Sequence, residues 1–109
     1  MAVRYNPGPL GTGGVGGSLV QGYTDSTGTP GNVTNNSPSG RAAVNTGASS
    51  CVVTNSTCVA TSKVFVQLIG AADATLTSIT ALTIAAGSFT VTGNANATAA
   101  KSFEFLVVN

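Results

Sequence analysis

From residue 44 to its last residue, the chain consists of short runs of strand-forming residues separated by turn residues. Val, Ile, Thr and Phe dominate the runs, and Asn, Gly, Ser and Asp fill the gaps between them. The strands that this pattern predicts cover residues 51–54, 63–69, 77–84, 88–92 and 102–108. Their starts are spaced by roughly 8–14 residues without a helical apolar period, which is typical of β-sandwiches and barrels. We therefore predict an all-β fold, a small antiparallel β-sandwich of jelly-roll-like type.

The preceding 43 residues have a different composition, dense in Gly, Thr, Asn and Pro. Such a segment loses much backbone entropy when it becomes ordered and offers few side chains to a core. We therefore predict an extended Gly-rich N-terminal arm over residues 1–43 and a β-sandwich domain over residues 44–109. The arm would be pinned to a neighbouring surface by anchors among its sparse apolar residues, namely Leu10, Leu19, Val20 and Tyr23.

Charged residues are scarce, at 6% of the chain against about a quarter in an average protein. The four cations are scattered, so no basic patch is present to bind nucleic-acid phosphates. The first residues contain no signal-peptide pattern, and the most apolar stretch, 64–69, is far shorter than the roughly 20 residues that cross a bilayer. We expect a protein made in the cytoplasm, with neither nucleic acid nor membrane as a partner.

Two of the predicted strands carry apolar residues on both faces. In the strand at 63–69, Phe65 and Ile69 lie opposite the core-facing positions, and in the strand at 102–108 Leu106 and Val108 do so. Either loops of the same domain or another subunit would cover this second face. A domain of about 60 residues is marginally stable alone, which favours another subunit. We therefore expect a homo-oligomer, most simply a trimer.

No catalytic, cofactor or metal site is predicted. The chain has no His, which excludes Ser-His-Asp and Cys-His catalysis and leaves no plausible zinc ligand set. The three carboxylates, Asp25, Asp73 and Glu104, lie in separate segments, which argues against a paired acid and base. The run at 11–16 matches the letters of a dinucleotide-binding fingerprint but lacks the strand and helix that such a motif requires. We predict that the protein is not an enzyme.

The two cysteines bracket a candidate turn at 54–57. If the flanking segments pair as a hairpin, a disulfide could join Cys51 to Cys58. Alternatively, both are small buried hydrophobic residues of a protein made in a reducing cytoplasm. The sequence leaves both possibilities open.

A resemblance to a known family rests on five different segments of the C-terminal part, at 48–56, 62–66, 72–75, 86–91 and 103–109; the segment at 86–91, for example, reads Ala-Gly-Ser-Phe-Thr-Val. Together they resemble a small C-terminal β-domain that recurs in virion proteins of tailed bacteriophages and prophages, over residues 44–109. The resemblance implies a trimeric or otherwise self-associating module on a capsid, tail or fibre, without catalytic residues. The family pattern has other residues at positions 51 and 58, so it does not explain the cysteines.

The resemblance is compatible with several roles on the virion. A fibre protein usually needs a long shaft, whereas a capsid cement or decoration protein needs only a compact β-domain and an arm that crosses capsid subunits. We therefore expect a virion structural protein that stabilises the shell by bridging subunits of the major capsid protein or other virion subunits.

The alternatives are a tail or fibre-tip component and a carbohydrate-binding β-module. A sugar site usually presents exposed aromatic rings, but Trp is absent and the two tyrosines, Tyr5 and Tyr23, fall in the predicted arm.

Overall fold

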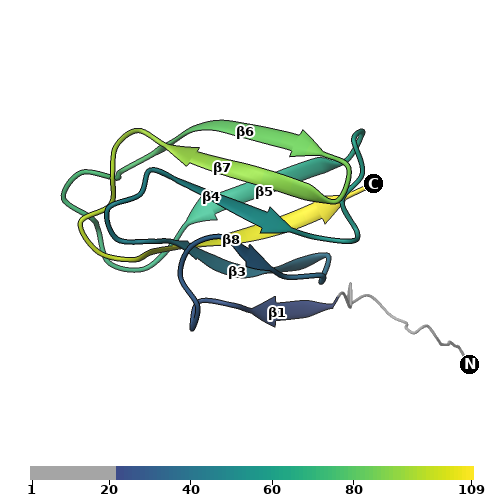
Figure 1. Cartoon of the computed structure of the whole chain (residues 1–109), viewed down its shortest axis with the longest axis horizontal. Coiled ribbons are helices and arrows are strands. Elements are labelled where there is room, and N and C mark those ends of the chain that lie inside the picture. The colour runs from purple at the N-terminus through teal and green to yellow at the C-terminus, as the bar shows by residue number, and fades with distance from the viewer. Residues whose placement is uncertain (1–21) are drawn as a thin grey trace, which may run out of the picture.

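The computed structural model describes residues 22–109, and within that range the protein is all-β, without a helix (Figure 1). Its strands are β1 (Tyr23–Asp25), β2 (Val33–Thr34), β3 (Ser39–Val44), β4 (Ser50–Thr54), β5 (Lys63–Leu68), β6 (Ile79–Ala85), β7 (Ser88–Gly93) and β8 (Lys101–Val108). They form two four-stranded sheets. One has the order β1-β3-β8-β5 and is called the β8 sheet here; the other has the order β2-β4-β7-β6 and is called the β7 sheet.

Most neighbouring strands are antiparallel, and the exceptions are the pairs β1–β3 and β2–β4, which are parallel. The chain passes to the other sheet at every connection except the hairpin between β6 and β7. This hairpin turns at Ala86 and Gly87, and Gly87 has a φ of 82°, a left-handed conformation that glycine adopts without steric cost. Figure 1 shows β6, β7 and β4 in one layer and β8, β3 and β1 in the other.

The core lies between the two sheets and follows from strict alternation along the central strands. In β8, Phe103, Phe105 and Val107 are buried, whereas the residues between them are only partly buried. The same alternation buries Phe89 and Val91 of β7. The rings of Phe89 and Phe105 meet across the two layers with centroids 5.1 Å apart and a tilt of 57°. Such tilted aromatic pairs are favourable, so this contact helps to hold the sheets together.

The all-β prediction is confirmed, and all five predicted strands are present with ends displaced by no more than two residues. The sequence pattern did not indicate β1, β2 and β3. These strands lie where the arm was expected, because they contain few of the large apolar residues that mark a strand.

Over residues 22–43 the structure therefore differs from the predicted arm. β3 lies inside the β8 sheet, between β1 and β8, and pairs with β8 over six positions. Ala42 and Ala43 are fully buried there, so a boundary after residue 43 would cut through this strand. Backbone hydrogen bonds and small buried side chains hold residues 22–43 in the fold. The amino-acid composition of the segment does not reveal these two stabilising contributions.

β1 approaches β3 closely because Gly40 has no side chain. A Cβ atom at Gly40 would lie 2.2 Å from the backbone oxygen of Thr24. The buried Asn35 side chain secures this contact, since its Nδ2 donates to the Thr24 oxygen at 2.9 Å and to Ser26 Oγ at 3.1 Å. These contacts place Tyr23 on the β8 sheet.

Candidate functional site

An open groove of about 440 Å³ lies on the outer face of the β8 sheet. It is lined by Tyr23, Ser39, Phe65, Val66, Gln67, Glu104, Phe105 and Leu106. These residues belong to all four strands of the sheet. The volume falls within the roughly 300–1,000 Å³ that is usual for small-molecule sites.

Strand pairing arranges the outward-facing side chains of this sheet in two adjacent rows, because residues directly opposite one another share a face. The first row runs across the sheet as Tyr23, Ser39, Leu106 and Phe65. The second row runs as Asp25, Arg41, Glu104 and Gln67. The groove is lined by the whole of the first, largely apolar row and by Glu104 and Gln67 of the second, polar row.

Two aromatic rings stand at the ends of the apolar row. Tyr23 is 52% exposed and Phe65 is 62% exposed, and both are among the large hydrophobic residues that the structure leaves in solvent. β1 and β5 are the edge strands of the sheet, so their backbones lie three strand spacings apart, about 14 Å. The Tyr23 ring leans inward over β3 toward β8, so the space between the two rings is narrower than the separation of their strands.

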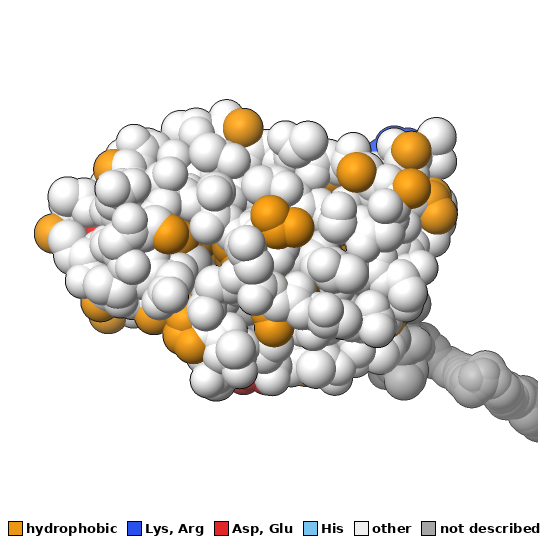
Figure 2. All heavy atoms as spheres, in the orientation of Figure 1, with side chains coloured by type: hydrophobic (Ala, Val, Ile, Leu, Met, Phe, Trp, Pro, Cys, Tyr) orange, Lys and Arg blue, Asp and Glu red, His pale blue; other side chains and the backbone are white. Residues whose placement is uncertain are grey.

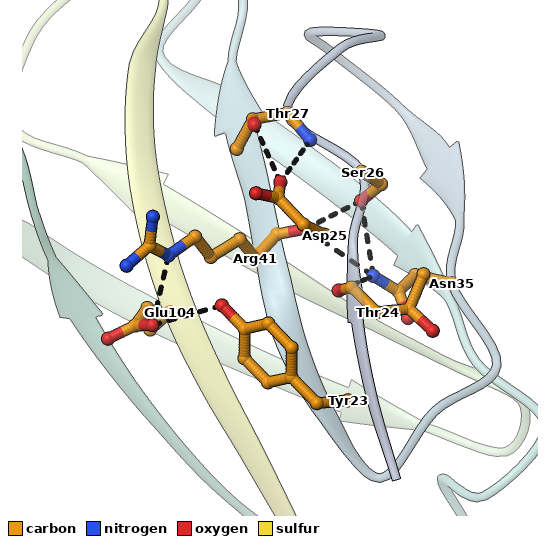
Figure 3. Close-up of polar contacts among 8 residues, drawn as sticks. All are labelled: Tyr23, Thr24, Asp25, Ser26, Thr27, Asn35, Arg41 and Glu104. Atoms are coloured by element: carbon orange, nitrogen blue, oxygen red, sulfur yellow. Dashed lines mark hydrogen bonds and ion pairs between the residues drawn. The ribbon is translucent and has the colours of Figure 1, made fainter.

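The polar row centres on the carboxylate of Glu104. Arg41 Nε donates to Glu104 Oε2 at 3.0 Å, and the hydroxyl of Tyr23 donates to the same oxygen at 3.1 Å. Figure 3 shows the Tyr23 ring reaching from β1 across β3 toward Glu104 on β8. The hydrogen bond from Arg41, followed by that from Tyr23, lowers the pKa of Glu104. Glu104 is therefore an ionised hydrogen-bond acceptor at neutral pH.

The strand that carries Tyr23 is held in place by a second group of polar contacts (Figure 3). The Asp25 carboxylate accepts hydrogen bonds from the backbone N–H and the hydroxyl of Thr27, at 2.9 and 2.6 Å, and these bonds lower the pKa of Asp25. The hydroxyl of Ser26 donates to the carbonyl of Arg41 at 2.6 Å. Tyr23 is thus presented from a fixed backbone.

These features suit binding better than proton transfer. A general acid needs a carboxyl whose pKa is raised toward neutrality, and the pKa of Glu104 is shifted in the opposite direction. Residues 22–109 contain no group of three or more His, Cys, Asp or Glu side chains that could hold a metal ion. What the groove offers a ligand is aromatic surface, one carboxylate and the exposed amide of Gln67.

A smaller hollow of about 220 Å³ lies beside Asp73 and Lys101. Its polar groups already have hydrogen-bond partners within the protein. The Asp73 carboxylate accepts hydrogen bonds from the backbone N–H groups of Leu76, at 2.9 Å, and Thr98, at 3.1 Å, and so connects two loops. The nearly buried Lys101 ammonium donates to the carbonyls of Ile69 and Ala71, at 2.9 and 2.7 Å. This cluster has a structural role.

Both cysteines are buried free thiols in the structure, which shows no disulfide between them. The Cys51 thiol donates to the carbonyl of Gly31 at 3.2 Å, and burial raises its pKa to about 11. The Cys58 thiol instead lies 3.5 Å from the carbonyl oxygens of Ala85 and Ser88. The two side chains therefore occupy separate environments in the core.

Of the predicted anchors, Leu10, Leu19 and Val20 lie outside the described residues, and Tyr23 lies on β1 in the groove. No sequence motif marked the other members of the groove as a site. The sequence did carry one indication of the groove, because strand alternation places Phe65 and Leu106 on an apolar second face of their strands. The pairing of Arg41 with Glu104 joins residues 63 positions apart and left no local signal.

No family model, curated protein or solved structure matches this chain. The described part of the chain also contains no helix that is long and apolar enough to span a membrane. The fold and the groove therefore carry the functional argument, together with the resemblance noted in the sequence.

Proposed function

We propose that this protein is a structural protein of a bacteriophage virion, a capsid cement or decoration protein that is made in the host cytoplasm and bridges subunits of the shell. By binding the assembled shell in preference to free subunits, it would stabilise the shell through mass action. The observation that carries the proposal is the uncharged outer face of the β7 sheet.

The strands of the β7 sheet present only hydroxyl-bearing and small apolar side chains on their outer face. The outward-facing residues are Thr34, Ser50, Val52, Thr54, Ala81, Thr83, Ala85, Ser88, Thr90 and Thr92. Figure 2 shows one side of the molecule, on which charged side chains appear only near the outline. Charged residues are depleted in the centres of protein interfaces because burying them is costly. A sheet face of this composition suits a broad contact with capsid subunits.

We further propose that the protein self-associates, most simply as a trimer. Val108, which is 41% exposed, lies on the outer face of the β8 sheet and does not line the groove. Exposed large apolar residues on edge and near-edge strands favour association between copies. Light scattering at micromolar concentration tests this proposal, and a stable folded monomer would contradict it.

The fold that we propose is of jelly-roll type. Its support is the connectivity: β3, β8 and β5 are adjacent in one sheet, β4, β7 and β6 are adjacent in the other, and the chain alternates between them up to the single hairpin. Sandwiches of this type are frequent in capsid and lectin domains. The fold by itself does not define a function.

The decisive experiment is co-sedimentation of the full chain with shells assembled from the major capsid protein of the phage or prophage that encodes it. The chain should sediment with assembled shells and should not bind unassembled capsid subunits. Thr90→Lys places a charge in the middle of the uncharged face and should abolish co-sedimentation. Thr46→Lys, a matched substitution in an exposed turn, should leave it unchanged. Failure of the wild-type chain to bind shells would refute the cement role.

A tail or fibre-tip position is the second candidate function, and the groove with its exposed aromatic rings favours it. Gold-labelled antibody against the chain, imaged on purified particles, separates the two roles. Label over the shell supports cementing, whereas label confined to the tail tip supports attachment to the host.

A further inference from the structure

We infer that the groove on the β8 sheet is a binding site for a neutral oligosaccharide. The inference goes beyond the proposed role in the shell and uses the opposite sheet. From the sequence, a sugar site was not expected, because Tyr23 fell in the predicted arm and not on the β-domain. The structure removes that objection, since Tyr23 lies on β1 and forms one end of a groove whose other end is Phe65.

The two rows of the groove match the two kinds of surface on a sugar ring. A pyranose has C–H groups that lie against aromatic rings, and Tyr23 and Phe65 offer ring surface that is more than half exposed. Its hydroxyl groups are hydrogen-bond donors and acceptors. The ionised Glu104 carboxylate accepts from such hydroxyls, and the Gln67 amide both donates and accepts.

The polar groups that a ligand would use are already oriented. Arg41 and Tyr23 fix Glu104 through hydrogen bonds of 3.0 and 3.1 Å to a single carboxylate oxygen, Oε2. The side-chain amide of Gln67 is exposed and makes no hydrogen bond within residues 22–109, so it has capacity for a ligand. Preorganisation of this kind reduces the ordering cost of binding.

The geometry disfavours a peptide that would bind over the floor of the groove as an added strand. β3 and β8, which form the floor of the groove, each have a partner strand on both sides, so their backbone groups are engaged in the sheet. A peptide that adds to a sheet needs a free strand edge. The ligand in this groove must be recognised by side chains.

The charges disfavour an acidic sugar. Arg41 is the cation of the polar row, and it lies between Asp25 and Glu104 in the strand register. Its guanidinium is already paired with the Glu104 carboxylate at 3.0 Å. A sialic acid or a sulfate in the groove would meet the Glu104 carboxylate, whose neighbouring cation is already paired, and the like charges would repel it.

The test is a glycan array that carries neutral hexose and N-acetylhexosamine oligosaccharides beside sialylated and sulfated ones, probed with the full chain. Neutral glycans should bind, and isothermal titration with the strongest of them should give the affinity. Phe65→Ala should weaken that affinity by about tenfold or more, because it removes a stacking ring. Gln67→Ala should weaken it by about two- to tenfold.

Val59→Ala is the matched control, because Val59 is a 44% exposed apolar residue that does not line the groove. It should bind the glycan as the wild-type chain does. Thermal unfolding of each variant, followed by circular dichroism, confirms that the fold is kept, and the exposure of Phe65 makes unfolding unexpected. Particle binding, which the Thr90→Lys variant tests, should be unaffected by Phe65→Ala, so the two proposals fail separately.

Three results would overturn the inference. The first is the absence of binding to any neutral glycan, and the second is a preference for acidic glycans. The third is a fall in oligomeric state of Phe65→Ala by light scattering without an effect on glycan binding, which would assign the groove to a second copy of the chain.

Discussion

Replacing Gly40 with alanine should disrupt the docking of β1 on β3. The added Cβ would lie 2.2 Å from the backbone oxygen of Thr24, 3.0 Å from Asn35 Nδ2 and 3.2 Å from the ring of Phe105. The shortest of these contacts involves backbone, so no side-chain rotation relieves it. β1 would have to move by about 1 Å to reach ordinary van der Waals separation.

The expected cost follows from the contacts that such a movement breaks. Overpacking of a well-packed site costs about 1–3 kcal/mol. Losing the hydrogen bond from buried Asn35 to Thr24, which is 2.9 Å long, adds about 1 kcal/mol. The free energy of unfolding should therefore fall by about 2–4 kcal/mol. For a domain of this size, each kcal/mol shifts the melting temperature by about 4–8 °C.

Thermal unfolding followed by circular dichroism measures the effect, with Gly28→Ala as the matched control. A Cβ at Gly28 would meet nothing within 4 Å. This control should change the stability by no more than about 1 kcal/mol, and in the stabilising direction, because alanine restricts the unfolded chain. Equal melting temperatures for Gly40→Ala and Gly28→Ala would refute the docking of β1, and would support the loosely attached arm that the sequence had predicted.

Three further predictions address the core, the loops and the thiols. A Cβ at Gly93 would lie 2.8 Å from Cγ of the fully buried Leu76, so Gly93→Ala should cost about 1–3 kcal/mol in urea unfolding. The cost should be smaller in the Leu76→Ala background, and additive effects would contradict the contact. Hydrogen bonds, chiefly from the backbone N–H of Leu76, hold the pKa of Asp73 below its ordinary value of 3.8, so its folded pKa lies below its unfolded pKa. The ionised Asp73 therefore stabilises the folded state fully at pH values above its unfolded pKa, and this stabilisation is lost as the pH falls below about 4. On acidification the melting temperature should fall further in the wild type than in Asp73→Asn. Equal falls in the two proteins would argue against this linkage. Cys51, with its pKa raised to about 11, and the buried Cys58 should react slowly with a disulfide reagent at neutral pH, and both should react after denaturation without reductant. Recovery of no thiol from the denatured chain would instead demonstrate a disulfide.

The positions of five strands could be predicted because the information is local. In β8 the core residues Phe103, Phe105 and Val107 alternate with less apolar residues, and this alternation is visible within a few positions of the chain. The same alternation separates Phe89 and Val91 of β7 from their neighbours. The turn between β6 and β7 is also a local feature, an Ala-Gly pair at 86–87 whose glycine adopts the left-handed conformation without steric cost.

The groove was only partly predictable. The outward-facing positions of Phe65 and Leu106 follow from alternation, but alternation does not say which residues lie beside them on the next strand. Tyr23 donates to Glu104 across a separation of 81 residues, and that contact exists only because β3 is placed between β1 and β8. Strand order is a property of the whole fold.

Composition determined that the chain is strand-rich and poor in charge, and local alternation determined which side chains enter the core. Only the tertiary structure decided that residues 22–43 belong to the two sheets. Their contribution is made by backbone pairing, by the missing side chain of Gly40 and by the buried amide of Asn35. A Gly-rich segment looks flexible in the sequence because glycine lacks a side chain to pack. At Gly40 the same lack of a side chain allows another strand to approach the backbone closely.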